Sequence, residues 1–225
     1  MKYFINNSAS LRDRILFLES HFSKIQLSPT LITTNKCLIP MPPFTNATFC
    51  ATSKAILQII QSKEFEIENN CLKYKIITDK GICIQKSVEL DQDTVKPFMV
   101  DDYAKFELEE EVAKYLSKIK DFKYMKFSSE NENYNDSILE NNKENTNGKK
   151  CFSCAFATIK FDETVGITIY FPCDIKFKPF KLRCKDLWFL NDHYHKVVIC
   201  VSNFAVYFCL YDNDIVTIFQ VEIVF

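Results

Sequence analysis

Four stretches of the chain repeat apolar residues at helical spacing. In the first, the apolar positions recur at steps of four, three and four, and serines stand before them as candidate N-caps. In the third, three successive glutamates come first, and they suit the positive end of a helix dipole. The predicted helices cover about residues 9 to 24, 52 to 63, 109 to 122 and 185 to 194.

The segments between these helices alternate apolar and polar residues with period two, which is typical of half-buried strands. Leu72, Tyr74 and Ile76, for example, alternate with two lysines. Near the C-terminus, two alternating runs flank the polar sequence Asp212-Asn213-Asp214. This pattern predicts a β-hairpin with a polar turn.

The order of the predicted elements repeats along the chain. Each helix follows one short strand and precedes about three strands, and this unit occurs four times with a period of roughly fifty residues, which indicates internal duplication. Two units form a domain of two helices against sheet, so we expect an α+β protein with two similar domains. The expected boundaries are 1–88 for the first domain, 89–101 for a connector and 102–225 for the second domain.

One segment, 128–150, departs from the composition of the rest. It contains seven asparagines and five acidic residues, with only Tyr134, Ile138 and Leu139 to bury. Such a composition predicts a disordered insertion in the second domain.

Composition excludes several classes of protein. The chain has three glycines in 225 residues, and Gly81, Gly148 and Gly166 stand far apart. No phosphate-binding glycine loop can be assembled from them, so P-loop, Rossmann and kinase interpretations fail. The net charge of -1 argues against bulk electrostatic coating of nucleic acid, so any contact with DNA must be local.

Ten cysteines would suggest a disulfide scaffold in a short secreted chain, but the N-terminal residues lack the apolar run of a signal peptide. We therefore expect reduced, mostly buried thiols. Cys151 and Cys154 form a single C-x-x-C pair, which we interpret as core thiols, with a metal or redox site as the alternative. The longest apolar run, 197–211, is shorter than the roughly twenty residues of a membrane helix.

The order of elements resembles that of sliding clamps of the proliferating cell nuclear antigen type. Within that family, the pattern of apolar and charged positions is most similar to the Hus-type subunit of the heterotrimeric nine-one-one checkpoint clamp. The segments that carry this resemblance are 1–3 (MKY), 51–57 (ATSKAIL), 182–190 (LRCKDLWFL) and 206–215 (VYFCLYDNDI).

The resemblance implies a non-catalytic DNA-clamp fold without cofactors, in which the helices share one concave face that lines a ring around double-stranded DNA. DNA would be held through its phosphates by basic residues on the helix faces. For each of these cations, an ordinary solvated helix face is an equally good interpretation. The candidate DNA-binding residues are Arg12, Arg14, Lys54, Lys114, Lys118 and Lys185.

The connector, 89–101, corresponds in clamps to a loop beside a pocket that binds peptides of client enzymes. The candidate partner contacts are therefore Leu90, Val95 and Phe98. The alternative is a plain linker whose apolar residues cover the sheet.

The function we expect is that of a scaffold subunit of a nuclear checkpoint clamp in the DNA damage response and repair. Its expected partners are two other clamp subunits, double-stranded DNA, a clamp loader and repair or checkpoint client proteins, with no membrane. One alternative is a homotrimeric replication clamp. Two others have no DNA role, namely a β-rich interaction module and a thiol enzyme that uses His193 or His195 with a cysteine.

Overall fold

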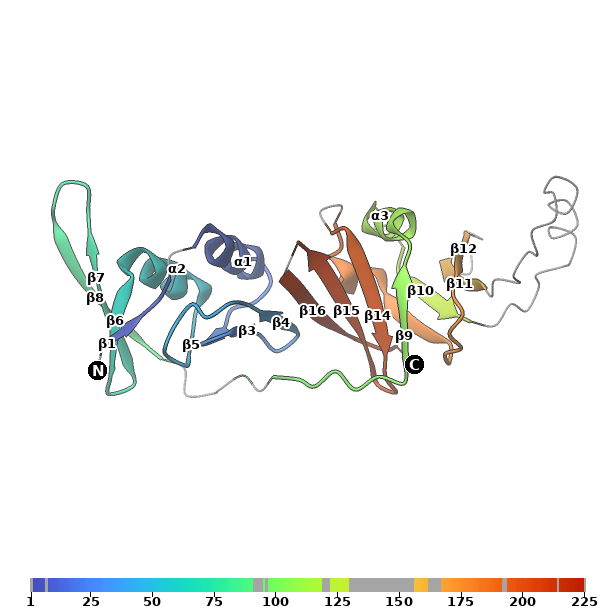
Figure 1. The fold of residues 1–225 in the computed structure, drawn as a ribbon, viewed down its shortest axis with the longest axis horizontal. Coiled ribbons are helices and arrows are strands. Elements are labelled where there is room, and N and C mark those ends of the chain that lie inside the picture. Colours follow the sequence, from blue (N-terminus) through green and yellow to red (C-terminus); the bar gives the residue numbers. More distant parts are fainter. Residues whose placement is uncertain are drawn as a thin grey trace, which may run out of the picture. The chain divides into compact units, whose positions relative to one another are not determined.

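The structure is a computed structural model, and it describes residues 2–6, 8–90, 95, 97–118, 122–129, 156–161, 167–191, 194–213 and 215–224. The chain divides into two compact units (Figure 1). One unit comprises Met1–Met99 with Ile215–Thr217, and the other comprises Val100–Asp214 with Ile218–Phe225.

In the first unit, a strand, a helix and three strands occur twice in succession. One antiparallel sheet has the order β1-β6-β7-β8, and four further strands follow one another as β5-β2-β3-β4. The first strand of each repeat therefore joins the three strands of the other repeat. The elements are β1 (Lys2–Phe4), α1 (Ala9–Glu19), β2 (Ile25–Ser28), β3 (Leu31–Thr33), β4 (Cys37–Pro40), β5 (Phe49–Ala51), α2 (Ser53–Ser62), β6 (Glu64–Glu68), β7 (Cys71–Ile77) and β8 (Cys83–Glu89).

The second unit has the same order and the same exchange of first strands. Its sheet has the order β12-β11-β10-β13, and β16-β15-β14-β9 follow one another. The α+β class is thus confirmed, and the repeated order of elements recurs four times with the 3-10 turn η1 in the place of the fourth helix. The elements are β9 (Ala104–Leu108), α3 (Glu110–Lys118), β10 (Tyr124–Ser128), β11 (Phe156–Phe161), β12 (Thr168–Pro172), β13 (Phe180–Arg183), the 3-10 helix η1 (Cys184–Leu187), β14 (Lys196–Val201), β15 (Ala205–Asp212) and β16 (Ile215–Glu222).

Side-chain caps set the starts of the first two helices. Ser8 Oγ accepts the amide of Leu11 at 3.1 Å, and Thr52 Oγ1 accepts the amide of Ala55 at 3.3 Å. The second helix ends at Lys63, whose left-handed φ of 65° stops the helical path. The sequence therefore predicted α2 almost to the residue, whereas α1 ends five residues before the predicted Lys24.

The fourth predicted helix, 185 to 194, is wrong. Only the single 3-10 turn η1 forms there, and Leu190 continues it with an amide bond to the Leu187 carbonyl at 3.0 Å. Leu187, Phe189 and Leu190 are all buried. Apolar side chains this close in sequence would point to different sides of an α-helix, so they reach one core only on an irregular path.

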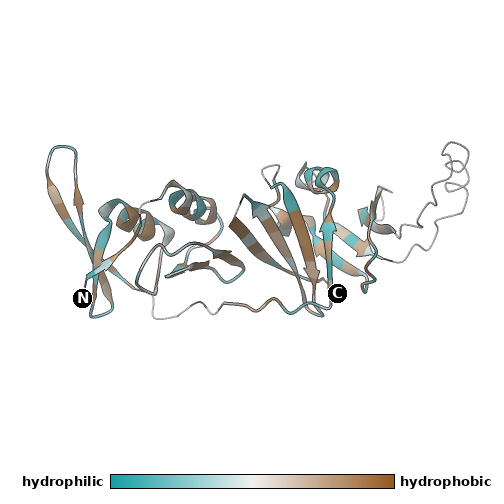
Figure 2. Ribbon diagram, in the orientation of Figure 1, coloured by the Kyte–Doolittle hydropathy of each residue, from teal (hydrophilic) through white to brown (hydrophobic). Residues whose placement is uncertain are grey.

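Each unit has an apolar interior that its helices help to close. In the first unit, α1 and α2 lie side by side, and α2 also packs on β6 and β7 (Figure 1). In the second unit, β14, β15 and β16 are predominantly hydrophobic (Figure 2). Their core is aromatic, since Phe189 is stacked on Phe219 with centroids 4.1 Å apart and meets Phe208 edge to face.

Two predictions fall largely outside the described residues. The predicted insertion lies there except for Ser128, at the end of β10, and Ser129, whose hydroxyl donates to the Phe177 carbonyl at 2.9 Å. The C-x-x-C pair, Cys151 and Cys154, lies there entirely. Among the described helices, none is both long enough and apolar enough to span a bilayer.

Candidate nucleic-acid and partner surfaces

The six predicted DNA-binding cations all lie on helical segments. Arg14 is half-buried, and the other five are exposed. They are distributed over both units: Arg12 and Arg14 on α1, Lys54 on α2, Lys114 and Lys118 on α3, and Lys185 on η1.

The cations of α1 are balanced by the acidic residues of the same helix. Asp13, next to Arg12 in sequence, and Glu19, at the end of the helix, are both exposed. Arg14 lies near a buried thiol: burial raises the pKa of Cys37, and the positive charge of Arg14 opposes part of that rise. The face of α1 is therefore not strongly attractive to phosphate.

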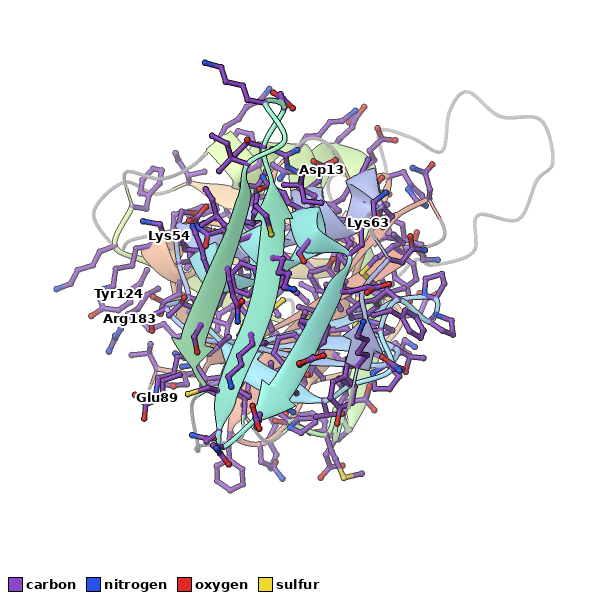
Figure 3. The ribbon with its side chains drawn as sticks, turned by 90° about the vertical axis from the view of Figure 1, so that its left-hand side faces the viewer. Asp13, Lys54, Lys63, Glu89, Tyr124 and Arg183 are labelled. Atoms are coloured by element: carbon purple, nitrogen blue, oxygen red, sulfur yellow. The ribbon has the colours of Figure 1, made fainter. Side chains whose placement is uncertain are left out.

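Helix α2 presents one exposed cation, Lys54, at its first turn (Figure 3). Gln58, one turn further along α2, is bound to the sheet. Its Oε1 accepts hydrogen bonds from Tyr74 Oη at 2.5 Å and from Lys86 Nζ at 3.2 Å. The Tyr74 hydroxyl is a donor at neutral pH, and burial raises its pKa further. These bonds fasten α2 to β7 and β8.

On α3, Lys114 forms an ion pair with Glu110, one turn earlier. Both side chains are about half exposed, so the pair adds little to stability. The hydrogen bond from Lys114 nevertheless holds the pKa of Glu110 below its usual range. Lys118 lies exposed at the end of the helix, and Glu111 lies exposed near its start.

Counted together, the helical segments are nearly neutral. Within their bounds, α1, α2, α3 and η1 carry six basic and five acidic residues. The six basic residues are the six predicted ones. Within their described bounds, the helical segments therefore carry a net charge of only +1.

Among the described elements, the strongest concentration of positive charge lies on a sheet, and the sequence analysis missed it. Strands β10, β11, β12 and β13 carry four basic and no acidic residues. In the sequence, these basic residues occupy polar positions of segments that alternate apolar and polar residues. However, the strand register was needed to bring together Lys126, Lys160, Lys181 and Arg183.

The three predicted partner contacts of the connector differ in exposure. Leu90 is only 8% exposed, and its backbone forms two bonds with Asn70: the Leu90 amide donates to the Asn70 carbonyl at 2.8 Å, and Asn70 Nδ2 donates to the Leu90 carbonyl at 2.9 Å. Leu90 therefore completes the end of β8 and covers the interior. Val95 and Phe98 are half-buried, whereas Met99 beside them is 85% exposed.

The thiol-enzyme alternative gains no support from the described residues. His193 lies outside them, and His195 and His21 are exposed, whereas six of the eight described cysteines are buried. The thiol of Cys200 hydrogen-bonds Cys209, which lowers the pKa of Cys209 and raises that of Cys200. The thiol of lowered pKa is thus buried beside another cysteine. No group of three or more potential metal ligands occurs within the described part of the chain.

Comparison with known proteins gives a match at the level of structure. No protein-family model matches the chain, and no curated protein matches its sequence. Proliferating Cellular Nuclear Antigen from Entamoeba histolytica superposes with a TM-score of 0.53 at 10% identity, over 99% of this chain and 98% of that one.

Two bacterial structures give similar values. The beta subunit of DNA polymerase from Streptococcus pyogenes has a TM-score of 0.57 at 9% identity, and the beta subunit of DNA polymerase III from Thermotoga maritima has 0.55 at 9%. Each superposition covers 99% of this chain. This chain in turn spans 64% of the length of the Streptococcus subunit and 65% of the length of the Thermotoga subunit. The chain therefore has the sliding-clamp fold.

Proposed function

We propose that this chain is a non-catalytic subunit of a ring that encircles double-stranded DNA. The observation that carries the proposal is the match to the Entamoeba nuclear antigen over nearly the full length of both chains. The match covers 99% of the chain and so includes all of its repeats, the last of which has the 3-10 turn η1 in place of an α-helix; it does not rest on one common motif.

A ring of such subunits needs a complementary edge at each of its contacts. In the first unit, β8 is a sheet edge of seven residues, and in the second unit β12 is one of the edges. Ile82 and Ile84 beside or on β8 are 59% and 41% exposed. Since a long, partly apolar edge is a template for strand pairing, we assign one side of the subunit contact to β8.

The low charge of the helices supports a heterotrimer as the form of the ring. Three identical copies would place only three net positive charges on their helices, since each copy contributes one. Phosphate binding depends on the number of cations that meet the backbone. In our proposal two different subunits supply the remaining charge, as in a nuclear checkpoint clamp of the DNA damage response.

The further partners in this proposal are a clamp loader and client proteins of repair or checkpoint signalling. Val95 and Phe98 are the connector residues that remain available to contact a client peptide, because they are incompletely buried. Leu90 is excluded from that role by its burial.

Light scattering during size exclusion of the purified chain tests the form of the ring. We expect a mass of 26.3 kDa for the chain alone, and a closed ring only with two different subunits. A mass of three times 26.3 kDa for the pure chain would instead establish a homotrimer and favour the replication clamp. Failure to form any ring with clamp subunits of the same cell would refute the proposal.

A further inference from the structure

The sheet β12-β11-β10-β13 has one apolar face and one basic face. On β10 and β13 buried and more exposed residues alternate, whereas on β11 Lys160 is exposed but Thr158, on the same face, is buried. The inward set is buried: Met125, Phe127, Ile159, Phe161, Phe171 and Leu182. The outward set includes the basic residues. We call the outward surface of Lys126, Lys160, Lys181 and Arg183 the basic face.

Register places three of these lysines in one row. Lys126 on β10 lies directly opposite Lys160 on β11 and directly opposite Lys181 on β13. All three are exposed. Neighbouring strands are about 4.8 Å apart, so the row extends over roughly 10 Å, and Arg183 adds a fourth cation two residues along β13.

The corresponding sheet of the first unit shows that this arrangement is not a general property of the fold. Strands β1, β6, β7 and β8 carry four basic and four acidic residues, and both signs appear among the side chains on that sheet in Figure 3. Lys73 there is paired with Glu68 at 2.5 Å. The basic face has no acidic residue on any of its four strands.

A row of like charges directly opposite one another opposes folding. A polyanion that bridges the row removes this repulsion. The basic face is therefore organised to favour a bound chain of negative charges over an empty surface.

The remaining side chains of this face suit phosphate and base contacts. Tyr124 lies opposite Arg183, and both point outward in Figure 3. Lys181 Nζ lies 4.4 Å from the Tyr124 ring centroid, which holds both side chains in place. Thr168 lies opposite Lys160, and Tyr170 on the same strand is 51% exposed. Lysine, arginine, threonine and tyrosine are the residue types that contact nucleic-acid backbones, and tyrosine also stacks on bases.

A peptide partner fits this face less well. Specific peptide binding relies on apolar anchors in a buried centre. Among the exposed large apolar side chains of the described residues, only Tyr170 lies on these four strands.

From this surface we propose a second nucleic-acid site, distinct from the helices, in which the basic face binds single-stranded DNA. The phosphates lie along the lysine row, and Tyr170 stacks on a base. Binding is independent of base sequence, because all the cationic contacts are to the backbone. The site belongs to one subunit, so it does not require a closed ring.

Fluorescence anisotropy of the full chain with a labelled oligothymidylate of about twelve nucleotides tests this inference. The test variant is Lys126→Ala/Lys160→Ala/Lys181→Ala. The matched control is Lys2→Ala/Lys75→Ala/Lys80→Ala, which removes the same charge from exposed lysines of the first unit.

Each lost phosphate contact reduces the slope of log affinity against log salt by about 0.7 for a single strand. We therefore expect the test variant to lose about two units of slope and roughly a hundredfold in affinity near 0.1 M salt. The control retains the wild-type slope. Tyr170→Ala weakens oligothymidylate binding by roughly five- to hundredfold, which is the loss of one stacked base.

Three results would overturn the inference: equal losses in the test and control variants, equal competition by polyglutamate, or duplex DNA binding tighter than the single strand with no effect of Tyr170→Ala. The test variant should melt at or above the wild-type temperature, because it removes repulsion between opposed lysines. If the triple variant unfolds instead, the single substitution Lys126→Gln replaces it in the comparison with wild type. For that variant we expect a decrease in the salt slope of about 0.7, which corresponds to one lost phosphate contact. Since these measurements use the free chain, they are unaffected if the ring proposal fails.

Discussion

Replacing Phe189 tests the packing of the second unit at a buried ring that contacts other aromatic side chains. Phe189 is 2% exposed, its ring is stacked on Phe219 with an interplanar angle of 3°, and Phe208 and Trp188 meet it edge to face at 5.5 and 5.8 Å. Phe189→Ala removes these contacts and leaves a cavity. Substitutions of this kind cost about 3–5 kcal/mol of unfolding free energy.

The assay is urea unfolding followed by the fluorescence of Trp188, the single tryptophan of the chain. With a denaturant slope of about 2 kcal/mol per molar, a loss of about 4 kcal/mol lowers the midpoint by about 2 M. Because Trp188 contacts both Phe189 and Phe219, its emission reports directly on this cluster.

The matched control is Phe204→Ala in the turn between β14 and β15. Phe204 is 79% exposed, so its removal should change the unfolding free energy by less than about 0.5 kcal/mol. Similar losses for the two variants, or a loss below about 1 kcal/mol for Phe189→Ala, would show that the aromatic cluster is not the core of this unit.

Three further predictions concern single side chains. Thr52→Ala should cost about 1 kcal/mol in thermal unfolding by removing the N-cap of α2, whereas Thr52→Ser should retain most of the stability; equal losses would exclude the cap. Tyr74→Phe should cost about 0.5–1.5 kcal/mol by removing the bond to Gln58. Burial raises the pKa of Tyr74 in the folded chain, so the unfolding free energy is unaffected by this group below the ordinary tyrosine pKa and falls as the pH rises above it. This alkaline loss should be smaller in Tyr74→Phe. An unchanged pH profile of stability in that variant would contradict the assignment. Among the described cysteines, exposed Cys83 should react with iodoacetamide before buried Cys37 in peptide mass mapping, and the reverse order would be inconsistent with the fold.

The fold could be predicted from the sequence because its repeats keep simple periods. The helical spacing of apolar residues before Lys63 corresponds to α2. The alternation of apolar and polar residues after Leu72 corresponds to β7. The region 185 to 194 failed because its apolar residues are buried by tertiary packing around Phe189, which no single helical stripe describes.

The candidate site was harder to predict. The helical cations could be placed on their helices, but the pairing of Lys114 with Glu110 and the attachment of Gln58 to the sheet depend on side-chain positions in space. The basic face depends on strand register, which joins Lys126 to a lysine more than thirty residues away. Sequence alternation marks such residues as outward, but it does not identify their neighbours.

The central claim is topological, so retention on closed DNA tests it most directly. The complex of this chain with its natural clamp subunits would be loaded on nicked circular plasmid, washed at high salt and then treated with a nuclease that linearises the plasmid. We predict that the complex stays on the circle, because salt screens phosphate contacts but does not open a ring, and that it leaves when the DNA gains free ends. Loss from the circle at high salt, or equal retention on linear DNA, would contradict the account.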